Sequence, residues 1–151
     1  MKLEAFLEEH GVKFHRHTHA KTFTSQGLAH AEHVSGYMVA KPVVVKTSSG
    51  FTMCVLAAPQ HLDLVRTAHV LHEPSARLAT EAEMAELFPD CELGAEPPVG
   101  AMFGMRTVMD EQLVEDDWLV MQAGTHTESV EMSRFDWERV CDPIVASITT
   151  P

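Results

Sequence analysis

Two strongly apolar segments joined by a short turn constrain the fold of this chain more than any other feature. The first contains three consecutive valines and spans Val43–Lys46, and the second spans Phe51–Ala58. Ser48-Ser49-Gly50 lies between them. Apolar and β-branched runs on both sides of a glycine-containing turn predict a β-hairpin. The valine run in particular predicts a strand buried inside the domain.

Short helical and extended patterns alternate along the rest of the chain. Helical periodicity or capping signals favour helices near residues 3–10, 25–33, 62–71, 81–88 and 133–140. Extended patterns favour further strands near residues 12–20, 107–110, 118–123 and 128–132. The tail at residues 142–151 is expected to be weakly ordered. Mixed strands and short helices in 151 residues predict a single α+β domain.

Composition narrows the classes of function that this domain can serve. No apolar run approaches the ~18 residues that a membrane helix needs, so no membrane association is expected. The opening MKLEAFLEEH has acids where a signal peptide has an apolar centre, which favours a cytoplasmic location. Cys54, Cys91 and Cys141 are odd in number and far apart, so we expect reduced thiols.

The net charge of −11 argues against extended contact with a nucleic-acid backbone, and DNA binding is not expected. It remains compatible with binding a few nucleotides at one end.

Histidines form the first candidate chemical group. His15, His17 and His19 alternate, so on a strand they share one face. Three imidazoles on one face could bind zinc, but no partner motif such as HExxH is present. A solvated polar face is the favoured interpretation, and no metal site is predicted. Cys54 lies within the second apolar segment, where a thiol is expected to pack in the core.

Two lysines flank the valine run. Lys41 and Lys46 are five residues apart, so on an extended backbone they face opposite sides. Lys46 precedes the turn and is expected to be solvated. Pro42 favours an extended backbone at Lys41, at the entrance to the buried strand. Two interpretations of Lys41 stay open: its ammonium reaches solvent along an apolar stem, or it holds a fixed charge in a partly dry cleft.

An ordered series of short motifs carries a resemblance to a known family. Val39-Ala40-Lys41 leads into the valine strand, MCVLAA returns it, and LDL opens a helix. The segment 94–98, GAEPP, then matches a GxxxP pattern that Val99-Gly100 continues. VMDEQL matches a strand ending in Asp-Glu, and AGTHTESVEM matches a closing hairpin. In this order, over residues 1–140, the chain resembles the YbaK/EbsC family, the free-standing relatives of the editing domain inserted in bacterial prolyl-tRNA synthetase.

The resemblance implies both a fold and an activity. The fold is one α+β domain over residues 1–151, with a mixed, barrel-like sheet surrounded by short helices. The activity is hydrolysis of the ester between a wrong amino acid and the 3′ end of tRNA, with proline tRNA as the expected substrate. No cofactor and no metal are implied. The expected partners are the acceptor end of an aminoacyl-tRNA and an aminoacyl-tRNA synthetase.

The resemblance also assigns candidate site residues. Its key lysine matches Lys41 rather than Lys46. Backbone N–H groups of the Gly94–Pro98 loop could stabilise the oxyanion formed when water attacks the ester, and Gly100 continues that loop. Gly124 and His126 match a substrate-side loop, where His126 either donates a hydrogen bond or moves a proton, or is an exposed loop histidine. Met102 and Phe103 either line the amino-acid pocket or belong to the core.

Two departures from the family pattern keep an alternative open. Pro42, which has no N–H, stands where many relatives have threonine or asparagine, and Val99 stands where many have phenylalanine. A chain that kept the fold and lost activity would be a binding module for a small ligand, a nucleotide or a partner protein. A metal-dependent hydrolase using the histidine-rich segment is the third hypothesis.

Overall fold

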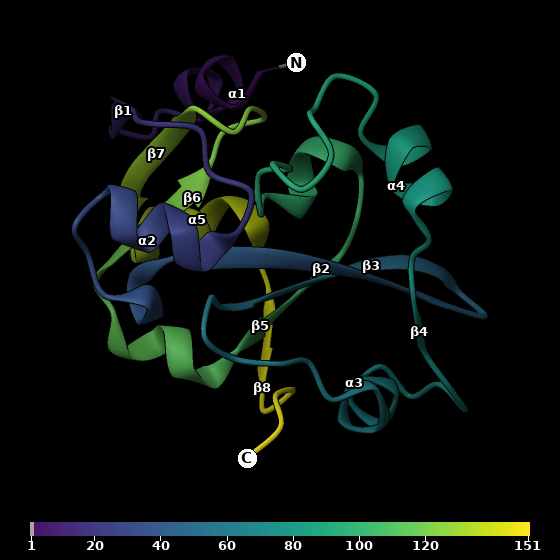
Figure 1. The fold of residues 1–151 in the computed structure, drawn as a ribbon. Coiled ribbons are helices and arrows are strands. Elements are labelled where there is room, and N and C mark those ends of the chain that lie inside the picture. The colour runs from purple at the N-terminus through teal and green to yellow at the C-terminus, as the bar shows by residue number, and fades with distance from the viewer. Residues whose placement is uncertain (1) are drawn as a thin grey trace.

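Residues 2–151 are described by a computed structural model (Figure 1). Its α-helices are α1 (Leu3–Glu9), α2 (Ser25–Ala31), α3 (Leu64–Val70), α4 (Glu81–Leu87) and α5 (Arg134–Cys141). Its strands are β1 (Phe14–Thr18), β2 (Ala40–Thr47), β3 (Gly50–Ala57), β4 (Arg77–Leu78), β5 (Thr107–Asp110), β6 (Trp118–Gln122), β7 (Glu128–Ser133) and β8 (Ile144–Ala146). Three 3-10 helices, η1 (Gly36–Met38), η2 (Gly100–Phe103) and η3 (Glu111–Glu115), complete the described secondary structure.

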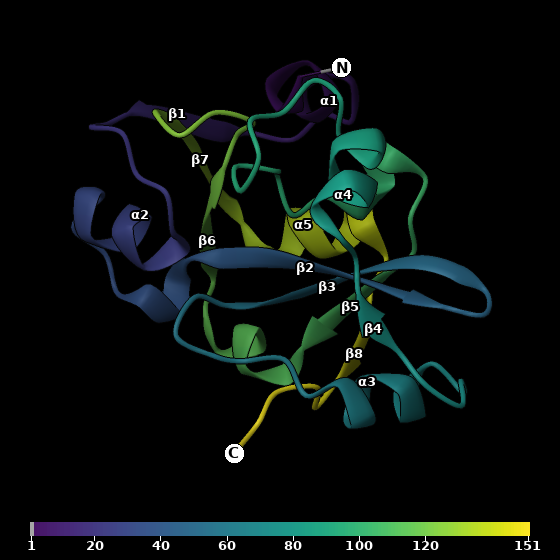
Figure 2. The ribbon, with the colours of Figure 1, turned by 45° about the vertical axis from the view of Figure 1, so that its right-hand side comes forward.

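The strands form two sheets that meet at one point. One sheet has the order β1-β7-β6 and the other has the order β4-β2-β3-β5-β8. A parallel bridge between Val39 and Val120 links them, so β2 passes close to β6 (Figure 2). Parallel pairs of β3 with β5 and of β5 with β8 make the larger sheet mixed. The predicted α+β class with a mixed sheet is therefore confirmed, and within residues 2–151 the two sheets do not close into a barrel.

The predicted hairpin is confirmed and forms the centre of the larger sheet. β2 and β3 pair antiparallel from Thr47 opposite Gly50 to Ala40 opposite Ala57. Gly50 has φ +109°, a backbone conformation that residues with a side chain rarely adopt. Strand β2 is longer than the valine run because it also includes Lys41 and Pro42.

Among residues 2–151, no strand pairs with the outer edge of β2 at Pro42. Strand β4 pairs only with Val45 and Lys46, and the Ala79 N–H donates to the Val44 carbonyl just beyond it. Proline cannot donate to a ladder and is tolerated at such an open edge. The edge of β2 at Lys41 and Pro42 is therefore available to border a cleft.

Apolar side chains fill both faces of the hairpin. On one face the main core packs Val44, Met53 and Val55 against Met109 and the fully buried Trp137 of α5. On the other face a smaller cluster includes Val45, Cys54, Leu71, Val108 and Ile148. Cys54 is thus a core residue, as predicted, and burial raises the pKa of its thiol to about 12.

The C-terminal tail is ordered, so the expectation of a weakly ordered tail is wrong. Strand β8 adds to the sheet edge beside β5, and Ile148 is buried. The Asp110 carboxylate at the end of β5 accepts a hydrogen bond from the Ile148 N–H at 3.1 Å. This order depends on partners about 38 residues away, which local periodicity cannot reveal.

Candidate active site

A cleft of about 310 Å³ lies beside the open edge of β2. Four segments border it: the start of α2, strand β2, helix α4 and the loop that precedes η2. Its lining residues are Phe23, Thr24, Ser25, Lys41, Pro42, Glu81, Met84, Leu93, Gly94 and Glu96. The structure therefore brings together Lys41 and Gly94, which lie more than fifty residues apart in the sequence.

Lys41 is half-buried, and two backbone carbonyl groups in the turn just after β3 accept hydrogen bonds from its ammonium. Its Nζ donates to the Ala58 carbonyl at 2.9 Å and to the Gln60 carbonyl at 2.5 Å. Burial lowers the pKa of Lys41 below its ordinary value. An ammonium has three N–H donors, so these two bonds leave one donor for a ligand.

Lys46 occupies a different environment, which separates the two lysines. Its Nζ lies 4.0 Å from the Glu83 carboxylate and 4.8 Å from the centre of the Phe51 ring. Glu83 also forms an ion pair with Arg77 at 2.7 Å. Lys46 therefore belongs to a surface charge group, whereas Lys41 lines the cleft.

The Gly94–Pro98 loop presents few free backbone donors. Gly94, at φ +88°, donates its N–H to both carboxylate oxygens of Glu96 at 3.1 Å. The Ala95 N–H donates to the Glu92 carbonyl, and the two prolines have no N–H. In the described part of the chain, the Glu96 N–H is the loop donor without a hydrogen-bond partner. Of the loop N–H groups that the sequence offered as oxyanion donors, the Glu96 N–H is the candidate that remains.

Neither Pro98 nor Gly100 lines the cleft. Both contact residues of the protein interior. The buried Trp137 Nε1–H donates to the Pro98 carbonyl at 2.8 Å. A Cβ on Gly100 would lie 2.3 Å from Thr107 Oγ1 and 2.8 Å from the Met105 carbonyl oxygen, so no larger residue fits there. The geometry gives both residues a structural part, and direct contact with substrate remains a prediction for each.

The turn between β6 and β7 clamps the same loop. The Gly124 N–H donates to the Ala95 carbonyl at 2.9 Å, and the Gly124 carbonyl accepts from the Glu92 N–H at 2.8 Å. The His126 N–H donates to the Glu92 carboxylate at 2.9 Å. Gly124 and His126 therefore lie against the Gly94–Pro98 loop, and their contact with substrate remains a prediction.

His126 is buried rather than solvated, and its ring supports the cleft rim. Its Nε2 lies 2.9 Å from the Leu93 carbonyl oxygen, so this nitrogen carries the proton and donates. The exposed Phe23 ring packs on the imidazole with 4.9 Å between ring centres. Nδ1 is buried and has no hydrogen-bond partner among residues 2–151.

A second hollow of about 260 Å³ adjoins the loop at Pro97. Met102 and Phe103 line it together with Cys91 and Gly124. These two residues also pack against the main core, so both interpretations offered by the sequence describe part of their environment.

Phe23 and Glu96 line the cleft but are not among the site residues predicted from the sequence. Phe23 gave no signal because one exposed aromatic residue in a loop has no periodic pattern. Glu96 lies within the GxxxP pattern, but its bonds from the Gly94 N–H depend on the loop conformation, which the pattern does not reveal. Within residues 2–151, no three histidine, cysteine or acidic side chains are grouped so that they could hold a metal ion.

Solved structures of other proteins share the fold of this chain. The chain superposes with a TM-score of 0.86 on a protein described as a candidate trans-editing enzyme for prolyl-tRNA synthetase, at 22% identity and covering 99% of this chain and 95% of that one. A hypothetical protein of known structure gives a TM-score of 0.88 at 20% identity, with 98% and 99% covered. These proteins share the α+β fold of this chain.

Sequence comparison then identifies the family. The model of the aminoacyl-tRNA editing domain matches residues 19–140, so the chain belongs to that family. The multifunctional Ser/Thr-tRNA deacylase ProXp-y of Escherichia coli K12 is 29% identical over 147 residues, which cover 94% of this chain and 87% of the relative. Its counterpart in Escherichia coli O157:H7 matches equally well. The predicted family and the predicted class of enzyme, an aminoacyl-tRNA deacylase, are confirmed.

Proposed function

We propose that this chain hydrolyses the ester of mischarged tRNA in the cleft between β2 and the Gly94–Pro98 loop. The observation that carries the proposal is the position of Lys41, a half-buried cation that shares one cleft with the glycine of that loop. An ammonium there offers one free donor to the anionic 3′ nucleotide or to the ester. Its charge is worth more in this partly dry site than in water.

Water is the nucleophile in this proposal. The water oxygen attacks the ester carbonyl carbon, the bond to the ribose 3′-oxygen breaks, and the free amino acid and an intact tRNA leave. The Glu96 N–H stabilises the oxyanion, and the terminal 2′-hydroxyl of the tRNA assists the water. Burial raises the pKa of Cys54 and Cys141 to about 12 and that of Cys91 to about 11, so none supplies a thiolate at neutral pH.

The amino acid is proposed from the relatives. ProXp-y is named for serine and threonine, which places seryl- and threonyl-tRNA first for this chain. Alanine and cysteine on proline tRNA, the substrates that the YbaK/EbsC resemblance implies, come second.

Hydrolysis of a panel of charged tRNAs tests the function. Seryl- and threonyl-tRNA, alanyl- and cysteinyl-tRNA for proline, and correctly charged prolyl-tRNA are each incubated with the protein. We expect at least one mischarged tRNA to lose its amino acid well above the spontaneous rate, and prolyl-tRNA to persist. Saturable binding of these tRNAs with no turnover would instead establish the binding module, which the missing N–H of Pro42 favours.

The tRNA is held only at its acceptor end. Among residues 2–151, Arg16, Arg66, Arg77, Arg134 and Arg139 all form ion pairs with acids. Near the cleft, Lys21 and Lys41 are the described cations without an acidic partner. Two phosphate contacts on a single strand correspond to a slope of about −1.4 in log affinity against log salt. A synthetase that delivers the tRNA would compensate for this weak affinity for tRNA.

Phe23 is expected to stack on the terminal base of the tRNA. The residue is 67% exposed and lines the cleft, and Lys21 Nζ lies 5.3 Å from the ring centre. Because base stacking on an aromatic ring contributes about 1–3 kcal/mol, Phe23→Ala should raise KM about tenfold, whereas Phe23→Trp should not. Phe135→Ala is the matched control, since that ring is 60% exposed but lies outside the cleft. An unchanged KM for Phe23→Ala would remove Phe23 from the binding site.

The described residues contain no helix with the length and apolar character needed to cross a membrane. A cytoplasmic location stays a prediction.

A further inference from the structure

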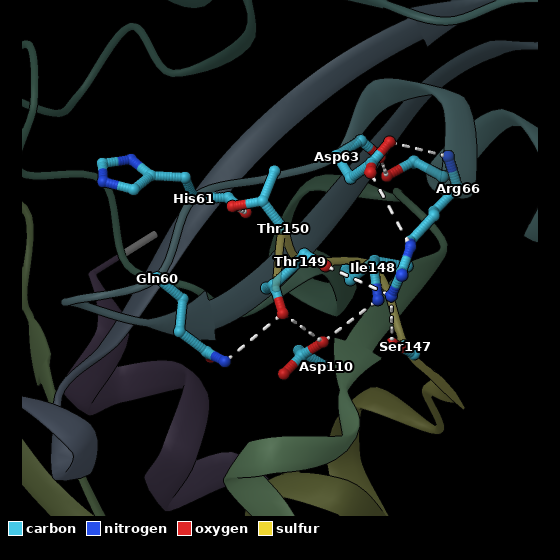
Figure 3. Close-up of polar contacts among 10 residues, drawn as sticks. Gln60, His61, Asp63, Arg66, Asp110, Ser147, Ile148, Thr149 and Thr150 are labelled. Atoms are coloured by element: carbon cyan, nitrogen blue, oxygen red, sulfur yellow. Dashed lines mark hydrogen bonds and ion pairs between the residues drawn. The ribbon is translucent and has the colours of Figure 1, made fainter.

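The segment Ser147–Thr150, here called the C-terminal strap, lies antiparallel to the chain just after β3 (Figure 3). The Asp63 N–H donates to the Ile148 carbonyl at 2.7 Å, and the Thr150 N–H donates to the His61 carbonyl at 2.9 Å. Arg66 adds bonds to Ser147 Oγ at 3.0 Å and to the Thr149 carbonyl at 3.4 Å. The strap therefore holds the segment that follows Gln60.

A polar chain connects the strap to that segment through buried groups. The fully buried Asp110 carboxylate accepts from the Thr149 hydroxyl at 3.4 Å, besides its bond from the Ile148 N–H. The Thr149 hydroxyl oxygen accepts from Gln60 Nε2 at 3.3 Å, as Figure 3 shows. Gln60 Oε1 in turn accepts from the Ala57 N–H at 3.3 Å. Asp110 thus fixes Thr149, and Thr149 fixes Gln60.

The last link of this chain is Lys41. The turn from Ala57 to Gln60 carries the two carbonyl groups that accept from the Lys41 ammonium. With two of its three N–H donors held by fixed carbonyls, the ammonium has one defined direction left for its third donor. A side chain with this many rotatable bonds would otherwise sample many positions.

We propose that the C-terminal strap positions the Lys41 ammonium, with Asp110, Thr149 and Gln60 as positioning residues for deacylation. The role in deacylation rests on the proposed function, whereas the restraint on Lys41 is a property of the folded chain. None of the three positioning residues lines the cleft in which the ester binds. Their effect on the reaction therefore passes through Lys41.

Thr149 allows a sharp test. Thr149→Val removes the hydroxyl and keeps the shape, Thr149→Ser keeps the hydroxyl, and Thr18→Val is the control at an exposed threonine of β1, outside the strap. We measure kcat and KM on the tRNA that wild type hydrolyses best. We also measure the rate at which formaldehyde and borohydride methylate the Lys41 amine, by peptide mass spectrometry. Thermal unfolding reports whether each variant is folded.

We expect Thr149→Val to lower kcat about fivefold to tenfold with KM within twofold, and to raise Lys41 methylation severalfold. Thr149→Ser should restore both values, and Thr18→Val should change neither. A folded Thr149→Val protein with wild-type kcat and wild-type Lys41 methylation would overturn the proposal.

If Thr149→Val unfolds, Gln60→Met tests the same proposal. It removes the amide that bonds to Thr149, and it does so at a partly exposed position that tolerates substitution better. If wild type hydrolyses none of the tRNAs, the proposed function fails. The methylation rates then still decide whether the strap restrains Lys41.

Discussion

Replacing Lys41 with alanine is expected to slow deacylation about 100-fold, mainly in kcat. That is the scale of losing one fixed donor to a developing charge. The measurement is single-turnover hydrolysis of the tRNA that wild type prefers, with the spontaneous rate subtracted. Lys46→Ala is the matched control on the same strand, because Lys46 pairs with Glu83 outside the cleft, and its rate should stay within twofold of wild type.

The pH dependence gives Lys41 an independent signature. Burial lowers its pKa, so its ammonium loses the proton at a lower pH than a free lysine would. The enzyme-dependent rate should therefore be present below that pKa and fall as pH rises through it. A wild-type rate in the Lys41→Ala protein would show that the chain is a deacylase whose catalytic site does not depend on Lys41.

Removing the indole of Trp137 is expected to cost about 3–5 kcal/mol of unfolding free energy. Trp137 is fully buried in the main core, and its Nε1–H donates to the Pro98 carbonyl at 2.8 Å. Trp137→Ala loses both the packing and that bond. Urea unfolding followed by circular dichroism measures the effect. Trp118→Ala is the matched control, since Trp118 is 45% exposed, and it should cost less than about 1 kcal/mol.

Trp137→Phe separates the bond from the packing. It keeps most of the buried area but leaves the Pro98 carbonyl without its donor, at a cost of about 1–3 kcal/mol. If the loop depends on this anchor, the Phe variant should also lose deacylation rate while still folded. Equal unfolding free energies for Trp137→Ala and Trp118→Ala would contradict the packing of α5 against the loop.

Structural elements that are determined by residues adjacent in the sequence could be predicted. The valine run and its glycine turn indicated the hairpin, and the local helical signals near residues 81–88 indicated α4, which begins with a capping box of Thr80 and Glu83. The resemblance placed Lys41 and Gly94 in one site, and the structure lines one cleft with both.

The parts that depend on distant contacts could not be predicted in this way. The strap is ordered by Asp110, which is itself recognisable only as the end of a short strand. Gln60 follows a proline in an ordinary turn, and its bonds to Lys41 and Thr149 exist only in the folded chain. Periodicity reports which face of an element is apolar, but it carries no information on which remote polar groups meet.

The proline beside Lys41 also determines what else the cleft can admit. An unpaired strand edge normally offers alternating N–H and C=O groups, to which an extended peptide can hydrogen-bond as an additional strand. Pro42 replaces one of those donors with a ring, so a peptide cannot continue the ladder at that position. The edge is therefore closed to strand addition, which protects the domain from self-association there. A single aminoacyl group needs no such ladder and can still reach Lys41.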